Sequence, residues 1–247
     1  NLIEKIMEEA EVYNIITATK IEKIQEEIKI CVSPNGMTKK YLKRAIYYDG
    51  EDDYSKYSFI AENVKIMVAG AMTRVGTTTT AIDLACYLSS IGAKVSYTEA
   101  NNSGHLTQIH SYFFPSILIN DNFFSHGNVD YFLNSRIPVD YNFNIIDIGV
   151  LNEKNTKVFD IGDVKLLCAG SKPYEIKELK KSLKTIDSTE KLNIILPENL
   201  TDIKKSIPLA QGNLLFSKLS NNLFDSSINT NIWRTMLSEY IVESKRL

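Results

Sequence analysis

The segment over residues 69–100, AGAMTRVGTTTTAIDLACYLSSIGAKVSYTEA, constrains the fold more than any other part of the chain. An apolar strand leads into a turn that contains Gly76, a run of threonines opens an apolar-faced helix, and Gly92 ends that helix before a second apolar strand. Near-continuous apolar strands separated by a helix are typical of a parallel sheet that is covered on both faces. The segment therefore predicts one unit of an α/β domain.

The same alternation continues along the chain. Apolar runs predict strands over residues 64–71, 93–100, 143–150, 164–170 and 192–198, and helical spacing predicts helices over residues 78–90 and 174–186. We predict a doubly wound α/β fold with a mostly parallel sheet, of the P-loop NTPase type. In such sheets ligands bind at the carboxyl ends of the strands.

The first 60 residues have a different pattern. Helical spacing occurs over residues 2–11 and 19–27, residues 28–36 alternate like a short strand, and residues 37–48 resemble a basic amphipathic helix. An acidic stretch follows at residues 49–57. We predict a small N-terminal α/β extension over residues 1–60 and the main domain over residues 61–247.

Composition excludes several classes of protein. With 247 residues, 44% of them hydrophobic and 23% charged, the chain is typical of a globular protein rather than a disordered one. The net charge of −2 gives no strong case for nucleic-acid binding. Three widely separated cysteines and the lack of a long apolar run or signal peptide favour a cytoplasmic location. The sequence leaves open whether a domain precedes Asn1.

The turn around Gly76 has the elements of an anion site. The first N–H groups of a helix have no partner within the helix, and the helix dipole adds partial positive charge there. The standard phosphate loop reads G-x-x-x-x-G-K-[ST]. Gly76 fits its second glycine and Thr78 its magnesium-binding hydroxyl, but Ala71 and Thr77 replace the first glycine and the lysine. Spacing alone fits both a phosphate site and a tight turn that threonines cap.

Three motifs together resemble the deviant-Walker ATPases of the ParA/MinD superfamily. The loop and helix resemble the pattern K-G-G-V-G-K-T-T-T-A-x-N-L-A-x-x-L, residues 97–107 (YTEANNSGHLT) resemble D-x-D-P-Q-G-N-L-T, and YNFNIIDIG resembles the Walker B strand with Asp147 as its carboxylate. The loop and helix residues in register are Val75, Gly76, Thr78, Thr79, Ala81, Leu84, Ala85 and Leu88. The resemblance covers roughly residues 64–247.

The resemblance implies a weak site for ATP or ADP with Mg²⁺, with no ligand at all as the alternative, and a homodimer. It implies that Thr78 and Asp147 hold the metal. Arg74 replaces a glycine of the pattern and could reach phosphate, although an exposed surface position is favoured. The nucleotide-binding residues that the resemblance predicts are Arg74, Gly76, Thr77, Thr78, Thr79, Glu99, Asn101 and Asp147.

Departures from the pattern concern the charged groups. Met72 and Thr77 stand where the family has its two loop lysines, and Asn101 stands where it has a carboxylate that helps to position water. Glu99 keeps an acid at the first strand-end position. Phosphoryl transfer depends on positioning and on cations, so efficient hydrolysis is not expected and no catalytic residue is predicted.

We therefore predict a pseudo-ATPase of the ParA/MinD/TadZ type that acts as a scaffold or a localisation and regulatory protein. The alternative is an active ATPase with non-standard catalytic groups that positions a partitioning, pilus or conjugation apparatus. A DNA-binding segregation module is disfavoured by the charge.

Two further features receive ordinary interpretations. The histidines His105, His110 and His126 match no zinc spacing and are interpreted as loop or surface residues. Residues 231–247 carry an amphipathic helical stripe, for which packing against the sheet is favoured over membrane contact.

Overall fold

The structure is a computed structural model, and it describes residues 6, 10–18, 21–33, 36–39, 42, 57–197 and 213–243. The chain divides into two compact units, Asn1–Asp53 and Tyr54–Leu247. The helices expected over residues 2–11 and 37–48 lie almost entirely outside the described residues, as does most of the acidic stretch at 49–57.

The described part of the first unit is built around helix α2 (Ile21–Cys31). The carboxylate of Glu27 accepts hydrogen bonds from the backbone N–H groups of Thr17 at 2.7 Å and Ala18 at 3.0 Å, which ties the preceding loop to the helix. The strand predicted over residues 28–36 is wrong, because α2 continues to Cys31 and Val32 N–H still donates to the Ile28 carbonyl at 3.0 Å. Within its described residues, this extension contains no strand.

The second unit holds an eight-stranded sheet in the order β4-β5-β3-β6-β2-β7-β8-β9. All neighbouring strands are parallel except the edge pair β4 and β5. The elements are β1 (Tyr57–Phe59), β2 (Val64–Gly70), α4 (Thr77–Ser90), β3 (Val95–Glu99), α5 (His105–Phe113), β4 (Phe123–His126), β5 (Val129–Phe132), β6 (Phe143–Val150), α6 (Thr156–Asp160), β7 (Val164–Cys168), α7 (Pro173–Thr185), β8 (Leu192–Pro197), β9 (Asn213–Ser217), α8 (Thr230–Met236) and β10 (Ile241–Glu243). The predicted α/β fold with a mostly parallel sheet is confirmed.

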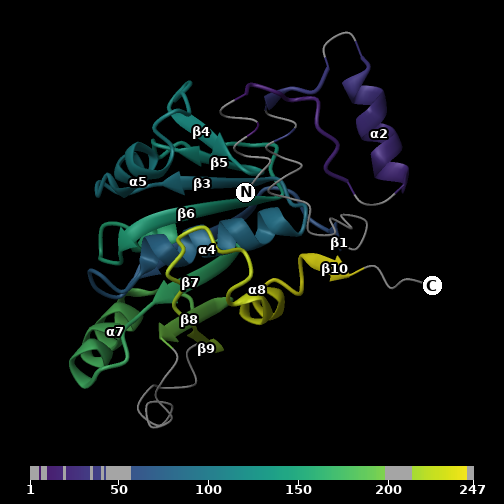
Figure 1. Cartoon of the computed structure of the whole chain (residues 1–247). Helices are drawn as coiled ribbons and strands as arrows, with labels where there is room; N and C mark the ends of the chain where they lie inside the picture. Colours follow the sequence, from purple (N-terminus) through teal and green to yellow (C-terminus); the bar gives the residue numbers. More distant parts are fainter. Residues whose placement is uncertain are drawn as a thin grey trace. The chain divides into compact units, whose positions relative to one another are not determined.

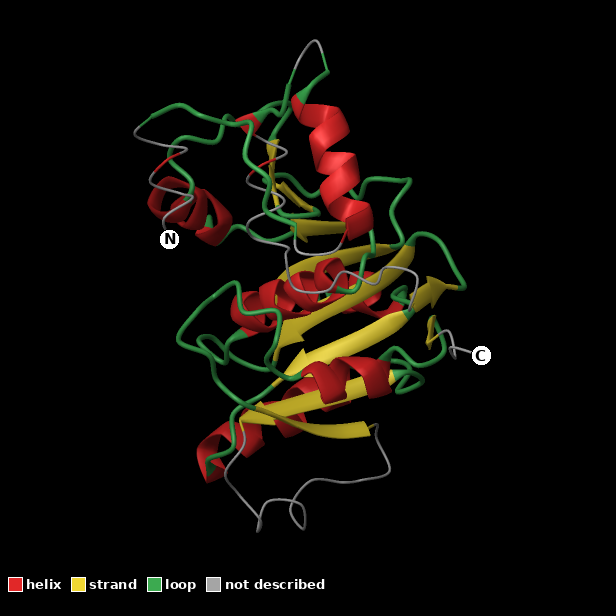
Figure 2. Cartoon of the chain, turned by 45° about the vertical axis from the view of Figure 1, so that its right-hand side comes forward, coloured by secondary structure: helices red, strands yellow, loops and turns green. Residues whose placement is uncertain are grey.

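Alternating residues of the central strand face two different cores. Ile66 and Val68 of β2 belong to the core that also contains α4 and α8, whereas Met67 and Ala69 belong to the core with α6 and α7. Figure 1 shows α4 running across the sheet over its central strands, and Figure 2 shows helices packed along the strands. Both faces of the sheet are covered, which explains why the strands read as continuous apolar runs.

The C-terminal segment is not one continuous helix. Helix α8 ends at Met236, a turn follows, and β10 pairs antiparallel with β1. The apolar stripe still points inward, because Trp233 and Leu237 are fully buried and Ile241 is 8% exposed in the α4 core. No helix in the described ranges is long and apolar enough to cross a membrane.

Candidate functional site

The turn between β2 and α4 is a strand-to-helix junction. Gly76 occupies the position before the helix with φ 84° and ψ 24°, in the left-handed region that favours glycine. A Cβ at Gly76 would meet no atom within 4 Å, so the space beside its backbone is open. Arg74 also has a positive φ of 62°. The first N–H groups of α4 therefore emerge at the carboxyl end of a central strand, beside open space.

Thr77 takes the place where a phosphate loop has its lysine. Its hydroxyl turns back onto the end of β2, where a Cβ on Gly70 would collide with Thr77 Oγ1. Gly70 is thus needed for this close approach. Thr77 is therefore a short neutral residue packed against the strand, and its side chain brings no positive charge to the loop.

Asp147, near the end of β6, is fully buried and accepts four hydrogen bonds through its carboxylate. Oδ2 accepts from Thr78 Oγ1 at 2.7 Å and from Tyr97 OH at 3.1 Å. Oδ1 accepts from Asn101 Nδ2 at 3.1 Å and from the Gly149 N–H at 2.9 Å. The loop helix, β3 and the segment after β3 therefore meet at this one carboxylate.

Burial and hydrogen bonding act on Asp147 in opposite directions. Burial raises the pKa of Asp147 above its ordinary value, while hydrogen bonds from Thr78, Gly149 and Tyr97 oppose the rise and nearby Glu99 adds to it. Burial, followed by the charge of Asp147, raises the pKa of Tyr97 well above its ordinary value. Tyr97 therefore keeps its proton and remains a donor to the carboxylate.

Asn101 serves as a donor at this site. Its Nδ2 donates to the backbone carbonyl of Asp147 at 3.0 Å as well as to the carboxylate. Its Oδ1 accepts from the Ser103 N–H at 2.9 Å. A carboxylate at position 101 has no N–H group to offer, so it would face Asp147 with like charge. The amide fits this arrangement and the family's carboxylate does not.

Glu99 caps helix α5. Its Oε1 accepts from the His105 N–H at 2.8 Å and from Ser103 Oγ at 2.9 Å, and its Oε2 accepts from the Leu106 N–H at 3.2 Å. These are N–H groups that the helix itself leaves unpaired. Both carboxylate oxygens are thus engaged at the start of α5.

His105 is exposed, as its interpretation as a surface residue predicted, but its ring lies beside Thr78 of the site; His110 is buried, so the interpretation as a loop or surface residue is wrong there. Its Nδ1 lies 3.3 Å from Thr78 Oγ1. Gly104, which precedes it with φ 67°, places the first turn of α5 beside the first turn of α4. The other two histidines lie elsewhere: a ring nitrogen of His110 contacts the Ile117 carbonyl at 2.8 Å, and His126 packs on Phe114.

Two predicted residues remain outside the network. Arg74 is exposed and makes no hydrogen bond or ion pair with any residue of the described ranges. Thr79 lies in the first turn of α4, and its side chain likewise has no hydrogen-bond partner in the part that the structure describes. The structure thus brings Thr78, Asn101 and Asp147 together and leaves Arg74 in solvent.

The donor set fits a divalent cation beside an anion. The hydroxyl of Thr78 is an oxygen ligand of the kind that Mg²⁺ prefers, the carboxylate of Asp147 accepts the proton of that hydroxyl, and the open space beside Gly76 leaves the helix N–H groups accessible. No three His, Cys, Asp or Glu side chains cluster as a metal site within the described ranges. A cation here would need Thr78 as a ligand.

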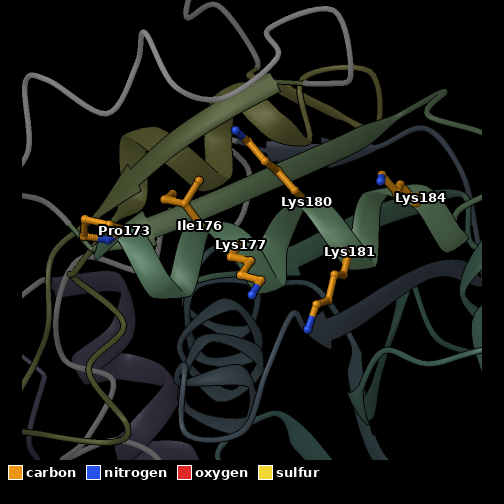
Figure 3. Close-up of a pocket in the computed structure, with 6 residues that line it drawn as sticks. All are labelled: Pro173, Ile176, Lys177, Lys180, Lys181 and Lys184. Carbon is orange, nitrogen blue, oxygen red and sulfur yellow. The ribbon is translucent and has the colours of Figure 1, made fainter.

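A second polar surface lies on α7, away from this network. A groove of about 460 Å³ is lined by Pro173, Ile176, Lys177, Lys180, Lys181 and Lys184. Figure 3 shows Lys177 and Lys181 pointing to the same side of the helix, as expected for residues four positions apart. Lys181 pairs with Glu178 at 2.8 Å, whereas Lys177 has no ion pair with the described residues.

Comparison with solved structures identifies the fold. The chain is similar to a plasmid partition protein of Borrelia burgdorferi bound to AMPPNP, with a TM-score of 0.52, 12% identity, and 72% of this chain and 98% of that chain covered. It is also similar to a chain of the MinC:MinD cell division protein complex of Aquifex aeolicus, with a TM-score of 0.53, 11% identity, and coverages of 74% and 99%. No protein-family model and no curated protein matches the sequence.

The chain has the fold of the ParA/MinD-type P-loop ATPases. These two neighbours are a plasmid partition protein and a member of a cell division protein complex. The resemblance of the sequence predicts the phosphate loop at the junction around Gly76 and the Walker B carboxylate at Asp147, and both assignments stay predictions. At these low identities the similarity establishes the fold, and the local chemistry has to be argued from the residues themselves.

Proposed function

We propose that this protein is a pseudo-ATPase that binds ATP or ADP weakly and acts through protein partners. The observation that carries the proposal is Thr77, whose neutral hydroxyl packs against Gly70 at the position of the loop lysine. Met72 and Asn101 replace two further charged groups of the family pattern. The fold of an ATPase is thus combined with a loop that lacks the two lysines of the family pattern.

The lost charges argue against turnover. Removing one preorganised electrostatic donor from an active site typically costs ~3–4 kcal/mol of transition-state stabilisation. Thr77 removes such a group, and the amide of Asn101 cannot act as a base near neutral pH. The losses need not add, but each one acts on the charge that develops during phosphoryl transfer.

Nucleotide binding depends on groups that the replacements at positions 72, 77 and 101 leave in place. The N–H groups at the start of α4 belong to the backbone, and the space beside Gly76 is open. Thr78 and Asp147 would hold Mg²⁺, which would then neutralise part of the phosphate charge. Weak affinity is expected, because the main-chain cradle acts without a lysine.

The biological role follows by analogy with the fold. Among relatives that the sequence resembles, the TadZ/CpaE type also combines a weakened loop with a preceding domain. We propose a homodimeric scaffold that helps to localise a pilus, secretion or conjugation apparatus. This part of the proposal rests on the fold and on the altered loop together.

The test is nucleotide binding and turnover by the purified chain. Calorimetry with ATP and with ADP, each in the presence of Mg²⁺, is expected to give weak binding of both. Phosphate release is expected to equal that of Thr78→Ala, which removes the metal-binding hydroxyl. Sustained release well above that control contradicts the pseudo-enzyme.

One observation favours the alternative, an active ATPase. Arg74 is exposed beside the loop and has no partner within the described residues, so it is available to a bound phosphate. In that case Arg74→Ala would abolish turnover and Arg74→Lys would retain part of it. The pseudo-ATPase proposal expects neither substitution to alter phosphate release.

A further inference from the structure

His105 is the site residue that the family pattern does not account for. The pattern D-x-D-P-Q-G-N-L-T has asparagine at this position. Here an imidazole lies with its Nδ1 3.3 Å from Thr78 Oγ1, the same hydroxyl that donates to Asp147 at 2.7 Å. A nitrogen ligand has thus been placed beside the hydroxyl that would contact the metal.

The donor and acceptor roles in the contact between Thr78 and His105 follow from the protons available. The hydroxyl of Thr78 has one proton, and this proton is donated to Asp147 Oδ2. Thr78 therefore presents a lone pair to His105. With the ring proton on Nδ1, His105 donates a hydrogen bond to this lone pair, whereas with the proton on Nε2 the two lone pairs face each other. In the second tautomer, a cation between the two atoms satisfies both.

The spacing of these atoms suits one metal ion. Metal–ligand distances near 2.1 Å place adjacent ligands of an octahedral ion ~3.0 Å apart. The separation of 3.3 Å between Thr78 Oγ1 and His105 Nδ1 is close to that value. Asp147, through its hydrogen bond to Thr78, would orient the hydroxyl and balance the charge of the ion.

Glu99 holds His105 at this distance. Its carboxylate accepts hydrogen bonds from the N–H groups of His105 and Leu106, which fixes the first turn of α5. The backbone of His105 is thus anchored independently of the imidazole. Residues that orient a metal ligand are a regular feature of metal sites.

We propose that His105 makes this site selective for a divalent first-row transition metal over Mg²⁺, with Thr78 Oγ1 and His105 Nδ1 as the direct protein ligands. Imidazole nitrogen binds Mn²⁺, Co²⁺ and Zn²⁺ more readily than Mg²⁺, which prefers oxygen. The inference rests on the proposed function, because it uses the metal position of the same nucleotide site.

The experiment measures metal binding directly. The full chain is titrated with Mn²⁺, followed by electron paramagnetic resonance of the free ion, and with Co²⁺, followed by visible absorption. Each titration is done with and without ADP, and Mg²⁺ affinity is measured by competition. The variant is His105→Asn, which restores the residue of the family pattern, and the matched control is His126→Asn, outside the site.

His105→Asn is expected to weaken Mn²⁺ and Co²⁺ binding at least about tenfold while Mg²⁺ affinity changes little. His126→Asn is expected to bind all three ions like the unaltered chain. Because His105 is exposed, the substitution should leave the fold intact, and thermal unfolding checks this. An equal effect on all three ions, or none, overturns the inference.

The measurements of nucleotide binding distinguish this inference from the proposed function. Binding of ADP in calorimetry without any binding of Mn²⁺ or Co²⁺ overturns the metal inference and leaves the pseudo-ATPase intact. Binding of the ions at His105 without any nucleotide supports the metal inference and overturns the nucleotide proposal. No binding of either kind overturns both.

Discussion

Two buried aspartates of the main domain have opposite surroundings. Asp147, on β6, is fully buried and accepts four hydrogen bonds. Asp83, on α4, is 4% exposed, and its Oδ1 is buried without a hydrogen-bond partner among the described residues. Burial, followed by the charge of Asp225, raises the pKa of Asp83 to about 7.

The difference shows how hydrogen bonds limit the rise in pKa that burial imposes on a carboxylate in this fold. Burial raises the pKa of both groups, but only at Asp147 do hydrogen bonds to the charged form oppose that rise. An ionised Asp147 is what a metal site requires. Asp83 is instead poised to gain or lose a proton near neutral pH.

The largest expected effect comes from a second acid in the network. Asn101→Asp removes the N–H donor to Asp147 and places like charge against it, so we expect the free energy of unfolding to fall by about 3 kcal/mol in EDTA. Mg²⁺ should restore part of the loss, since two carboxylates beside Thr78 make an oxygen site for the ion. Urea unfolding with and without Mg²⁺ measures both effects.

The matched control for that prediction is Asn102→Asp. Asn102 is exposed, so the same change of charge should alter stability little. Equal losses for the two variants would mean that the hydrogen bonds of Asn101 do not hold Asp147.

Asp83→Asn tests the unpaired acid. The folded-state pKa of about 7 exceeds the ordinary 3.8, so the folded chain holds a proton that the unfolded chain releases. Asp83 therefore makes stability fall as pH rises from about 4 to about 7. The amide should remove this slope and stabilise the fold at pH 8 by a few kcal/mol, with little effect at pH 4.

The partner variant Asp225→Asn sharpens this prediction. Asp225 raises the pKa of Asp83 by its charge, so its removal should shift the midpoint of the slope to lower pH without abolishing it. Thermal unfolding across the pH range distinguishes the two variants. An unchanged slope in Asp83→Asn would assign the pH dependence to another group.

A smaller effect is expected at the cap of α5. Glu99→Gln retains one oxygen acceptor for the helix N–H groups but loses the second acceptor and the charge. We expect a loss of about 1 kcal/mol, together with weaker Co²⁺ binding because His105 is held less firmly. Glu153→Gln, which changes an exposed acid, is the control in urea unfolding.

The smallest effect is expected on the lysine face of α7. The triple substitution of Lys177, Lys180 and Lys184 by alanine should change stability by less than about 0.5 kcal/mol, because exposed charges interact weakly and alanine suits a helix. Differential scanning calorimetry at low and high salt measures it. A clear destabilisation would show that these lysines make contacts that hold the fold.

The strands and helices of the sheet were predictable because their signals are local. Apolar runs bounded by polar turns predicted β2, β6 and β7, and α4 begins at Thr77, one residue before its expected start. The edge hairpin of β4 and β5 was missed, although the Gly127-Asn128 pair between two aromatic runs is a hairpin signal. Over residues 28–36 the alternation of apolar and polar residues predicted a strand, but helix α2 continues to Cys31.

The site was predictable only in part. The motif order placed Thr78 and Asp147 together, because Thr78 follows β2 and Asp147 lies near the end of β6, and these parallel strands end at one edge of the sheet. Sequence spacing gave no reason to expect His105 beside Thr78 or Tyr97 on Asp147, since those contacts join residues far apart in the chain. The roles of the predicted nucleotide-binding residues stay predictions.

By itself, the sequence determined that the chain forms a parallel α/β sheet with a helix N-terminus after Gly76, and that no lysine stands at position 77. These are properties of neighbouring residues and of their apolar periodicity. Only the tertiary structure decided that Asp147 accepts four hydrogen bonds, that Asp83 Oδ1 has no donor among the residues that the structure describes, and that an imidazole faces the loop threonine. Such facts depend on packing between distant segments, and packing sets the hydrogen bonds and charges around each buried group.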